Sequence, residues 1–271
     1  MSKLETRIRE IKERQVGNSS KRVLLLEGGD DVQAFDVFLR KAHPDFERSW
    51  VLAQAGKKQN VIDILAQEPD WLGLVDRDEW SDEKIAEITQ TTENLLFLPR
   101  YCIENYLILP RELWNALPEK QQNKITGGFP QLEQVVMQDL DRWVSHGVLW
   151  SIVNPLWEGL RSLGFKEKLL DPAISFDHGE ILKVLAEWHQ FLEPNHIIQR
   201  FRDKLEMVVK LSPTEKLSRH VHGKKFYEAV IDTSLNRLLG QRSADDRQKA
   251  IIRFMSVPDD LDCVWARMGL R

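Results

Sequence analysis

Four carboxylates stand at or shortly after the ends of short apolar runs, where they could act together. They are Glu27, Asp76, Asp78 and Glu104. Carboxylate oxygens are the hard ligands that Mg²⁺ or Mn²⁺ prefers, and a cluster of them has little reason to stay ionised without a cation. A divalent ion held in this way polarises a phosphoryl oxygen and activates water. The sequence therefore predicts a Mg²⁺ or Mn²⁺ site.

Taken singly, most of these carboxylates also have a structural interpretation. Asp78 could belong to the turn that leads to a helix capped by Ser81, and Glu104 could be a surface residue. Glu27 is harder to explain in this way, because a carboxylate between an apolar strand and two glycines gains nothing from burial. The metal-site prediction depends on the combination.

The elements that must position these residues are short strands that alternate with helices. The expected strands are Val23–Leu26, Ser49–Ala53, Leu72–Val75 and Asn94–Leu98. The expected helices cover residues 30–41, a stretch through 61–66, and residues 81–90. This alternation predicts an α/β fold, a parallel sheet with helices on both faces. Ligands of such a sheet bind at the carboxyl ends of the strands, where the four carboxylates are expected.

The chain divides into three regions by composition. Residues 1–20 are expected to form a solvated leading helix and a loop, and residues 21–109 the α/β core. Residues 110–271 lose the alternation and predict a mainly helical C-terminal region that contains several tryptophans. That region is a candidate surface for a partner protein.

Composition and charge exclude several classes of protein. With 42% hydrophobic and 30% charged residues the chain is neither disordered nor of low complexity, and no apolar run is long enough for a membrane helix. The charged start, MSKLETRIREIKER, has no apolar stretch for export, so we expect a cytoplasmic protein with no membrane partner. Cys102 and Cys263 are too few for a thiolate zinc site.

The formal net charge of −4 hides an uneven distribution. Residues 63–93 carry ten carboxylates against two basic residues, whereas residues 200–225 carry eight Lys or Arg against three acids. Basic residues beside aromatic ones suit nucleic-acid backbones and stacked bases, although a solvated helix face is the simpler interpretation. The predicted nucleic-acid-binding residues of this basic strip are Arg200, Arg202, Lys216, Arg219, Lys224 and Lys225.

Several nucleotide-binding and catalytic motifs are missing from the sequence. There is no Gly-x4-Gly-Lys-Ser/Thr loop, which argues against ATP hydrolysis by this chain. There is also no Gly-x-Gly-x-x-Gly after the first strand and no Gly-x-Ser-x-Gly elbow. Any ATP requirement would therefore belong to a partner.

The chemistry-bearing residues resemble the Toprim domain. Topoisomerases, bacterial primases, the overcoming-lysogenization-defect (OLD) nucleases and the ribonucleases that mature 5S RNA share this domain. The resemblance covers about residues 23–106 and rests on strand-Glu27-Gly28, Gly56-Lys57 before a helix, and strand-Asp76-Arg77-Asp78. Residues 103–106 (Ile-Glu-Asn-Tyr) and 222–224 (His-Gly-Lys) are similar to an OLD-like branch often found beside ABC-type ATPases.

This resemblance implies a metal-dependent endonuclease with Glu27, Asp76 and Asp78 as its acidic triad. Glu27 would complete the metal site or act as general base, and Lys57 would hold a phosphate at a helix start. The resemblance also implies the effector of an anti-phage defence system, controlled by an ABC-type ATPase subunit. RNA, including transfer RNA, is favoured over DNA as substrate, and a homodimer is compatible with this interpretation.

Two other interpretations remain open. The first is a catalytically silent Toprim module that serves assembly or nucleic-acid binding. The second is a phosphotransfer α/β enzyme with Asp76 as nucleophile. The second is weaker, because it leaves the position of Glu27 before Gly28 without an explanation.

Overall fold

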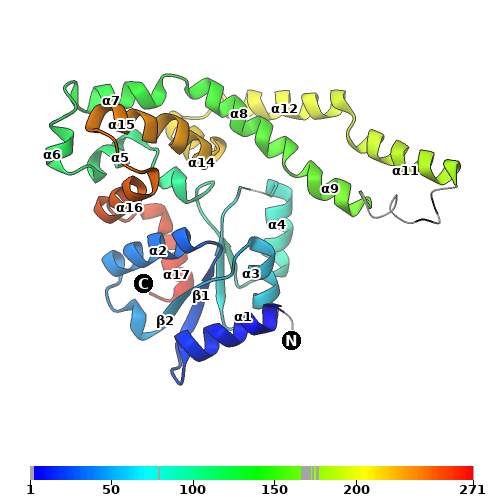
Figure 1. The fold of residues 1–271 in the computed structure, drawn as a ribbon, viewed down its shortest axis with the longest axis horizontal. Helices are drawn as coiled ribbons and strands as arrows, with labels where there is room; N and C mark the ends of the chain where they lie inside the picture. Colours follow the sequence, from blue (N-terminus) through cyan, green and yellow to red (C-terminus); the bar gives the residue numbers. More distant parts are fainter. Residues whose placement is uncertain (1–2, 79, 166–171, 173, 175–176, 271) are drawn as a thin grey trace.

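The computed structural model describes residues 3–78, 80–165, 172, 174 and 177–270 (Figure 1). Its centre is a parallel sheet of four strands in the order β2-β1-β3-β4. The strands are β1 (Arg22–Leu26), β2 (Trp50–Gln54), β3 (Leu72–Val75) and β4 (Leu95–Phe97). The predicted α/β class with a parallel sheet is confirmed, and each strand lies within one residue of its expected start.

Alternation along the strands assigns their side chains to two layers. Val23 and Leu25 of β1 point to one face, and Leu24 and Leu26 to the other, and all four are buried. Helices cover both faces, as expected for parallel strands with apolar side chains on each side (Figure 1). Helix α2 (Gly29–Ala42) covers the face of Leu24, whereas α1 (Lys3–Ile11) and α3 (Lys58–Leu65) cover the face of Val23. The remaining crossover helix is α4 (Asp82–Thr91).

The leading helix is packed against the sheet and not solvated. Ile8 and Ile11 of α1 are 7% and 1% exposed and belong to the same apolar cluster as Val61 of α3. Leu4, Ile8 and Ile11 recur at helical spacing, and this stripe covers the sheet face beside α3. A π-helical turn, η1 (Lys12–Val16), follows α1.

The mainly helical C-terminal part is confirmed. The elements that follow β4 begin with the 3-10 turn η3 (Ile103–Tyr106), α5 (Pro110–Ala116), α6 (Glu119–Gln122), α7 (Gly128–Met137), α8 (Leu140–Val153) and α9 (Leu156–Ser162). They continue with α11 (His178–Phe191), α12 (Pro194–Val208), α13 (Pro213–Glu215), η4 (Lys216–His220), α14 (Gly223–Phe226) and η5 (Tyr227–Asp232). The chain closes with α15 (Thr233–Leu239), α16 (Ala244–Phe254), η6 (Asp259–Leu261) and α17 (Asp262–Met268).

The C-terminal part and the α/β part share one apolar core. Trp265 of α17 packs edge-on against Phe35 of α2 at 6.0 Å between ring centroids, and both are buried. Trp50 of β2 donates from Nε1 to the carbonyl of Met268 at 3.1 Å. Arg100, just after β4, is 5% exposed and pairs with Glu112 of α5 and with Asp260 of η6. After the long helical segment, the end of the chain therefore packs against the α/β part again.

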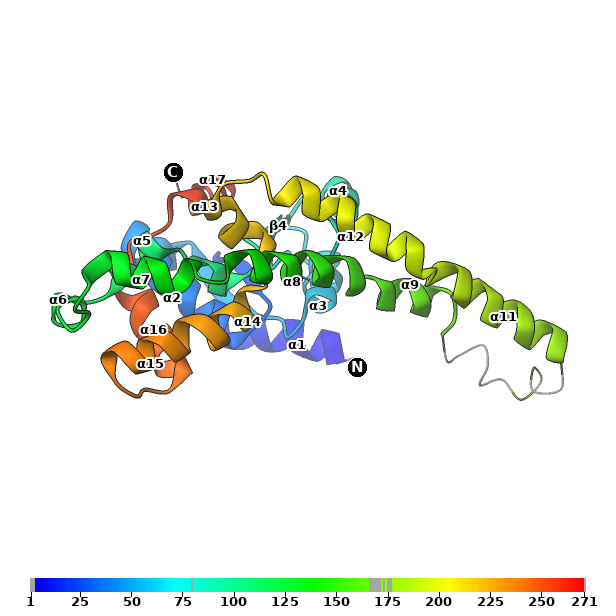
Figure 2. The same ribbon diagram turned by 90° about the horizontal axis from the view of Figure 1, so that it is seen from above.

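A helical arm projects from this core. It consists of α9, α11, α12 and the adjoining end of α8, and both views show it extending away from the sheet (Figures 1 and 2). Several exposed apolar side chains lie on it, including those of Trp150, Trp157, Leu182, Leu185 and Met207. In the described part of the chain, no helix is both long and apolar enough to cross a membrane.

Candidate functional site

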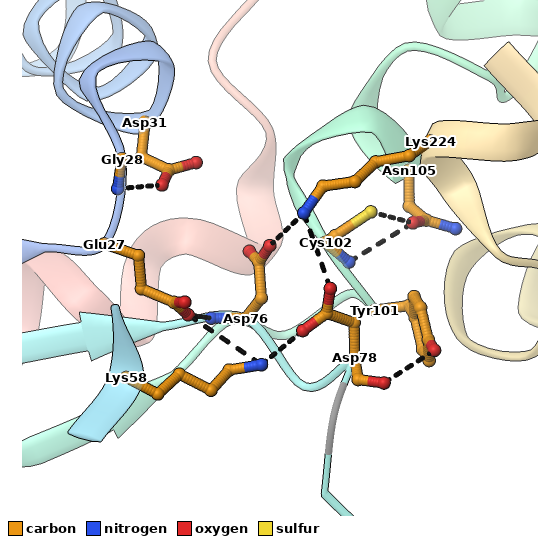
Figure 3. Close-up of polar contacts among 10 residues, drawn as sticks. All are labelled: Glu27, Gly28, Asp31, Lys58, Asp76, Asp78, Tyr101, Cys102, Asn105 and Lys224. Carbon is orange, nitrogen blue, oxygen red and sulfur yellow. Dashed lines mark hydrogen bonds and ion pairs between the residues drawn. The ribbon is translucent and has the colours of Figure 1, made fainter. Parts of the chain in front are cut away.

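Three of the predicted carboxylates meet at the carboxyl edge of the sheet. Glu27 follows β1 and Asp76 follows β3, and these strands are neighbours in the parallel sheet. A Glu27 carboxylate oxygen accepts the Asp76 backbone N–H at 2.9 Å, which fixes the first acid against the second strand (Figure 3). Asp78 lies two residues further on, and its backbone carbonyl accepts the Tyr101 hydroxyl at 2.8 Å. The convergence expected from parallel strands is present.

Two lysines lie between these carboxylates. Lys58, at the start of α3, has a side chain that is 3% exposed, and its ammonium group pairs with Asp78 and lies 3.9 Å from Glu27. Lys224 of α14 approaches from the C-terminal part, 3.5 Å from Asp76 and 3.4 Å from Asp78 (Figure 3). The site is therefore assembled from both parts of the chain.

Two further acids adjoin this group. Asp31, in the first turn of α2, accepts the Gly28 backbone N–H at 2.8 Å. Burial is the main reason for the raised pKa of Asp76, and the negative charge of Asp31 is the second. The two carboxylates therefore lie within electrostatic reach of each other. Glu104 in η3 acts on Asp31 in the same way, and its Oε2 is buried without a hydrogen-bond partner among the described residues. Five carboxyl groups thus surround two ammonium groups.

Burial and mutual repulsion raise the pKa values of two of the acids, whereas the two lysines lower the pKa of the third. Burial raises the pKa of Glu27 to about 7, although Lys58 opposes the shift. Burial, followed by Asp31 and Asp78, raises the pKa of Asp76 well above its usual value. Asp78 differs, because Lys58 and Lys224 overcome the effect of burial and lower its pKa. The site thus favours the protonated forms of Glu27 and Asp76, and a bound cation would oppose this effect.

The segment that carries Lys224 is held against η3 by buried hydrogen bonds. Asn105 is fully buried and donates from Nδ2 to the carbonyls of Leu217 at 2.6 Å and Val221 at 3.1 Å. A Cβ atom on Gly223 would lie 2.2 Å from Asn105 Oδ1 and 2.7 Å from Cys102 Sγ, so only glycine fits there. The two short motifs at 103–106 and 222–224 therefore lie against each other and deliver Lys224 to the carboxylates.

The types of donor atom suit a hard divalent cation, but the side chains that the structure describes are not arranged around a single point where the cation would lie. Carboxylate oxygens are suitable ligands, and the buried Oε2 of Glu104 accepts no hydrogen bond from the part of the chain that the structure describes. However, the described residues contain no group of three or more His, Cys, Asp or Glu side chains placed to hold a metal ion. The ammonium groups of Lys58 and Lys224 pair with Asp78 and Asp76 and neutralise part of the negative charge in this arrangement. Glu27, Asp76 and Asp78 would be the ligands of Mg²⁺, with Glu104 nearby.

Neither a family model nor a curated protein matches the chain. The assignment of a function therefore depends on the geometry of the site and on the short motifs.

The other predicted site residues are divided between the site and the surface. Lys57 is exposed and precedes α3, so the lysine at the carboxylates is its neighbour Lys58. In the basic strip, Lys224 reaches the acids, whereas Lys225 is exposed and pairs with Glu228 at 3.5 Å. Arg219 donates to the carbonyl of Pro99 at 3.2 Å. Arg200 and Arg202 are exposed on α12, and Lys216 is half-buried in η4.

Asp31 and Lys58 belong to the site but were not among the predicted site residues, although helical periodicity carries a signal for both. Asp31 is four residues before buried Phe35 and so shares the sheet-facing side of α2. Lys58 is three residues before buried Val61 and lies on the buried side of α3. A charged residue on the inward side of a crossover helix, one turn from the strand end, is the signal to look for.

Proposed function

We propose that this protein is a Mg²⁺- or Mn²⁺-dependent endonuclease of Toprim type. The observation that carries the proposal is the convergence of Glu27, Asp76 and Asp78 at the carboxyl edge of parallel strands, with two lysines among them. Phosphodiester hydrolysis needs anionic metal ligands and cationic groups that bind phosphate, and this edge of the sheet offers both.

Each side chain has a role in this proposal. Asp76 and Asp78 would hold the metal ion, which when bound supplies Lewis-acid polarisation of the phosphate and activation of water. Glu27 would complete the metal site or accept a proton from water, a role compatible with its pKa of about 7. Lys224 is 46% exposed at its side chain and would bind the scissile phosphate once the metal compensates the carboxylates.

The substrate and partners are part of the same proposal. We favour RNA, including transfer RNA, over DNA, on the resemblance of the motifs to those of OLD-like proteins. An ABC-type ATPase subunit would control the nuclease in an anti-phage defence system. The missing nucleotide-hydrolysis loop supports this division of labour, because ATP would then be hydrolysed by the partner.

A cleavage assay tests the proposal. Purified protein is incubated with transfer RNA, single-stranded RNA or plasmid DNA, in Mg²⁺, Mn²⁺ or EDTA, with and without the ATPase partner. We expect metal-dependent cleavage that falls by more than about 100-fold in Glu27→Ala and in Asp76→Ala. Cleavage that survives either substitution, or that persists in EDTA, would defeat the metal-site assignment.

A matched control is available on the same strand. Asp70 is exposed and comes just before β3, at the opposite edge of the sheet from Asp76. Asp70→Ala removes the same type of side chain without touching the site, so its cleavage rate should equal that of the wild type.

One observation favours a second candidate, the catalytically silent Toprim module. Lys58 and Lys224 already form ion pairs with Glu27, Asp76 and Asp78 without a metal ion. If Mg²⁺ cannot displace these contacts, the site would be a structural ion-pair network that joins the two parts of the chain. Absence of cleavage under every condition, together with a thermal midpoint that Mg²⁺ does not raise, would support this alternative.

A further inference from the structure

A row of aromatic rings leads from the carboxylates to the protein surface. Tyr101, whose hydroxyl donates to the backbone of Asp78, lies 5.9 Å from the ring of His222. His222 in turn lies 5.5 Å from the ring of Trp150 on α8. We call Tyr101, His222 and Trp150 the aromatic ladder. Its inner end touches the candidate metal site, and its outer end is a tryptophan that is 39% exposed.

The backbone holds α8 close enough for this arrangement. Gly147 is buried in α8, and a Cβ atom there would lie 2.1 Å from the carbonyl oxygen of His220. The helix therefore rests directly on the chain that precedes Lys224, and both views show it running beside α14 (Figures 1 and 2). Trp150 occupies the same side of α8 as Gly147, one turn further on.

The exposure of Trp150 is more than packing of the core requires. Trp265, which fills the shared core, is 2% exposed. Trp150 packs on one side against a half-buried histidine and leaves more than a third of its surface to solvent. A rigid, exposed aromatic face of this kind is a surface on which nucleobases can stack, and the histidine that it contacts lies two residues before Lys224.

Positive charge lies along the same region. Burial, Lys204 and Arg219 lower the pKa of His220, so both cations lie within electrostatic reach of the residue two before His222. Lys224, two residues after His222, faces the carboxylates. Lys204, Arg219 and Lys224 thus lie near the ladder and suit an anionic backbone, while Asp82 and Glu215 also act on His220 and Asp78 acts on His222.

We propose that the aromatic ladder binds an unpaired nucleobase, with Trp150 as the stacking surface, next to the phosphate at Lys224. The choice of nucleic acid as the ligand rests on the proposed function. A base inside a duplex is stacked on both sides by its neighbours and cannot reach an aromatic side chain in this way. The substrate class that follows is a single strand, loop or bulge.

Equilibrium binding of short fluorescein-labelled oligouridine and oligothymidine tests the inference. Ca²⁺ replaces Mg²⁺ to suppress cleavage, and fluorescence anisotropy reports Kd for the full-length protein. We expect Trp150→Ala to raise Kd about 5- to 100-fold, because a base that stacks on an aromatic ring loses its surface. Trp150→Phe should stay within a few-fold of the wild type. A fully paired duplex should bind equally to wild type and Trp150→Ala.

Trp157 provides the matched control. It lies on α9, is 51% exposed, and its ring packs against Phe165 at 5.5 Å between centroids, not against a ring of the ladder. Trp157→Ala should leave Kd unchanged. Equal effects of Trp150→Ala and Trp157→Ala, or the same loss for paired and unpaired probes, would overturn the inference.

Probes that contain one abasic nucleotide test the inference on the wild-type protein, so the result does not depend on whether a variant folds. One nucleotide at a time is replaced by an abasic nucleotide, and binding to the wild type is measured. We expect one position at which the missing base weakens binding, and no further weakening at that position in Trp150→Ala. If every position behaves alike, the stacking site does not exist. If cleavage depends on Glu27 but Trp150→Ala leaves Kd unchanged, this inference is wrong and the proposed function stands. If the protein binds no nucleic acid at all, the proposed function is wrong as well.

Discussion

Lys57 and Lys58 are adjacent in sequence and differ in almost everything else. Lys57 is exposed before the helix begins, whereas the side chain of Lys58 is 3% exposed and pairs with Asp78 and Glu27. A single step along the chain turns the side chain from solvent to the sheet edge, since residues at the start of a helix rotate by about 100° per position. The position of each lysine at the start of the helix therefore determines that Lys58, and not Lys57, belongs to the site.

Lys58→Met and Lys57→Met form a matched pair. We expect Lys58→Met to lower the free energy of unfolding by about 3 kcal/mol in EDTA, because it removes the cation beside Glu27 and leaves mostly buried Asp78 with Lys224 alone. Lys57→Met should change it by less than about 0.5 kcal/mol. Urea unfolding followed by circular dichroism measures both. Similar values for the two variants would contradict the placement of Lys58.

Glu27 makes the free energy of unfolding depend on pH, and the raised pKa of Glu27 determines the direction of that dependence. The pKa is about 7 in the folded protein against a usual value of 4.5, so folding is favoured while the group is protonated. This contribution is complete below about pH 4.5 and is lost as pH rises through 7. Relative to Glu27→Gln, the metal-free wild type should therefore lose on the order of 2 kcal/mol of unfolding free energy between pH 5 and pH 8.

Urea unfolding in EDTA at several pH values measures this difference. Glu133→Gln, at an exposed position on α7, is the control for the loss of a carboxylate. A difference between wild type and Glu27→Gln that does not change with pH would show that the environment of Glu27 is not the one described.

At the scale of elements, the contact between η3 and α14 brings the second lysine to the acids. Asn105 uses its amide to hold the carbonyls of Leu217 and Val221, and Gly223 leaves room for that amide. The geometry of the site therefore depends on a turn and a short helix that are far apart in sequence.

Gly223→Ala tests this contact. A methyl group would overlap Asn105 Oδ1 and Cys102 Sγ, so we expect a loss of about 1–3 kcal/mol in unfolding free energy. Cleavage should also fall, because Lys224 moves with the displaced helix. Gly29→Ala is the control, since its nearest contact would be at 3.6 Å and alanine is favoured in a helix. A neutral Gly223→Ala would contradict the close approach of the two elements.

At the scale of the whole molecule, the two parts of the chain are joined by one core. The division at residue 109 marks a change in sequence pattern, yet Trp265 and Met268 near the end of the chain pack on α2 and β2. Buried Arg100 links β4 to α5 and η6 through two carboxylates. The C-terminal helices therefore complete the apolar layer that α2 forms on one face of the sheet.

A fragment of residues 1–109 should not fold by itself. It would expose the apolar side chains of α2 and β2 that pack against Trp265 and Met268 in the full chain. We expect no sharp transition in urea and weak near-ultraviolet circular dichroism, while the full chain unfolds cooperatively. A sigmoidal transition of the fragment with native-like signal would show that the α/β part is an autonomous domain.

The sequence by itself determined the local features of this protein. Strand positions, the alternation with helices and the three acids that follow β1 and β3 could be predicted, because burial periodicity and strand ends are properties of short segments. The convergence of Glu27 and Asp76 followed from the parallel sheet alone, since parallel strands end at one edge.

Only the tertiary structure determined which lysines lie beside the carboxylates and that α1 packs against the sheet. Lys224 is 146 residues from Asp78 in the chain, and no local period connects them. Lys58 and Asp31 had a periodic signal, but their contacts depend on how their helices cross the sheet. Pairing of distant charges is determined by packing of whole elements, which the order of residues along one segment does not encode.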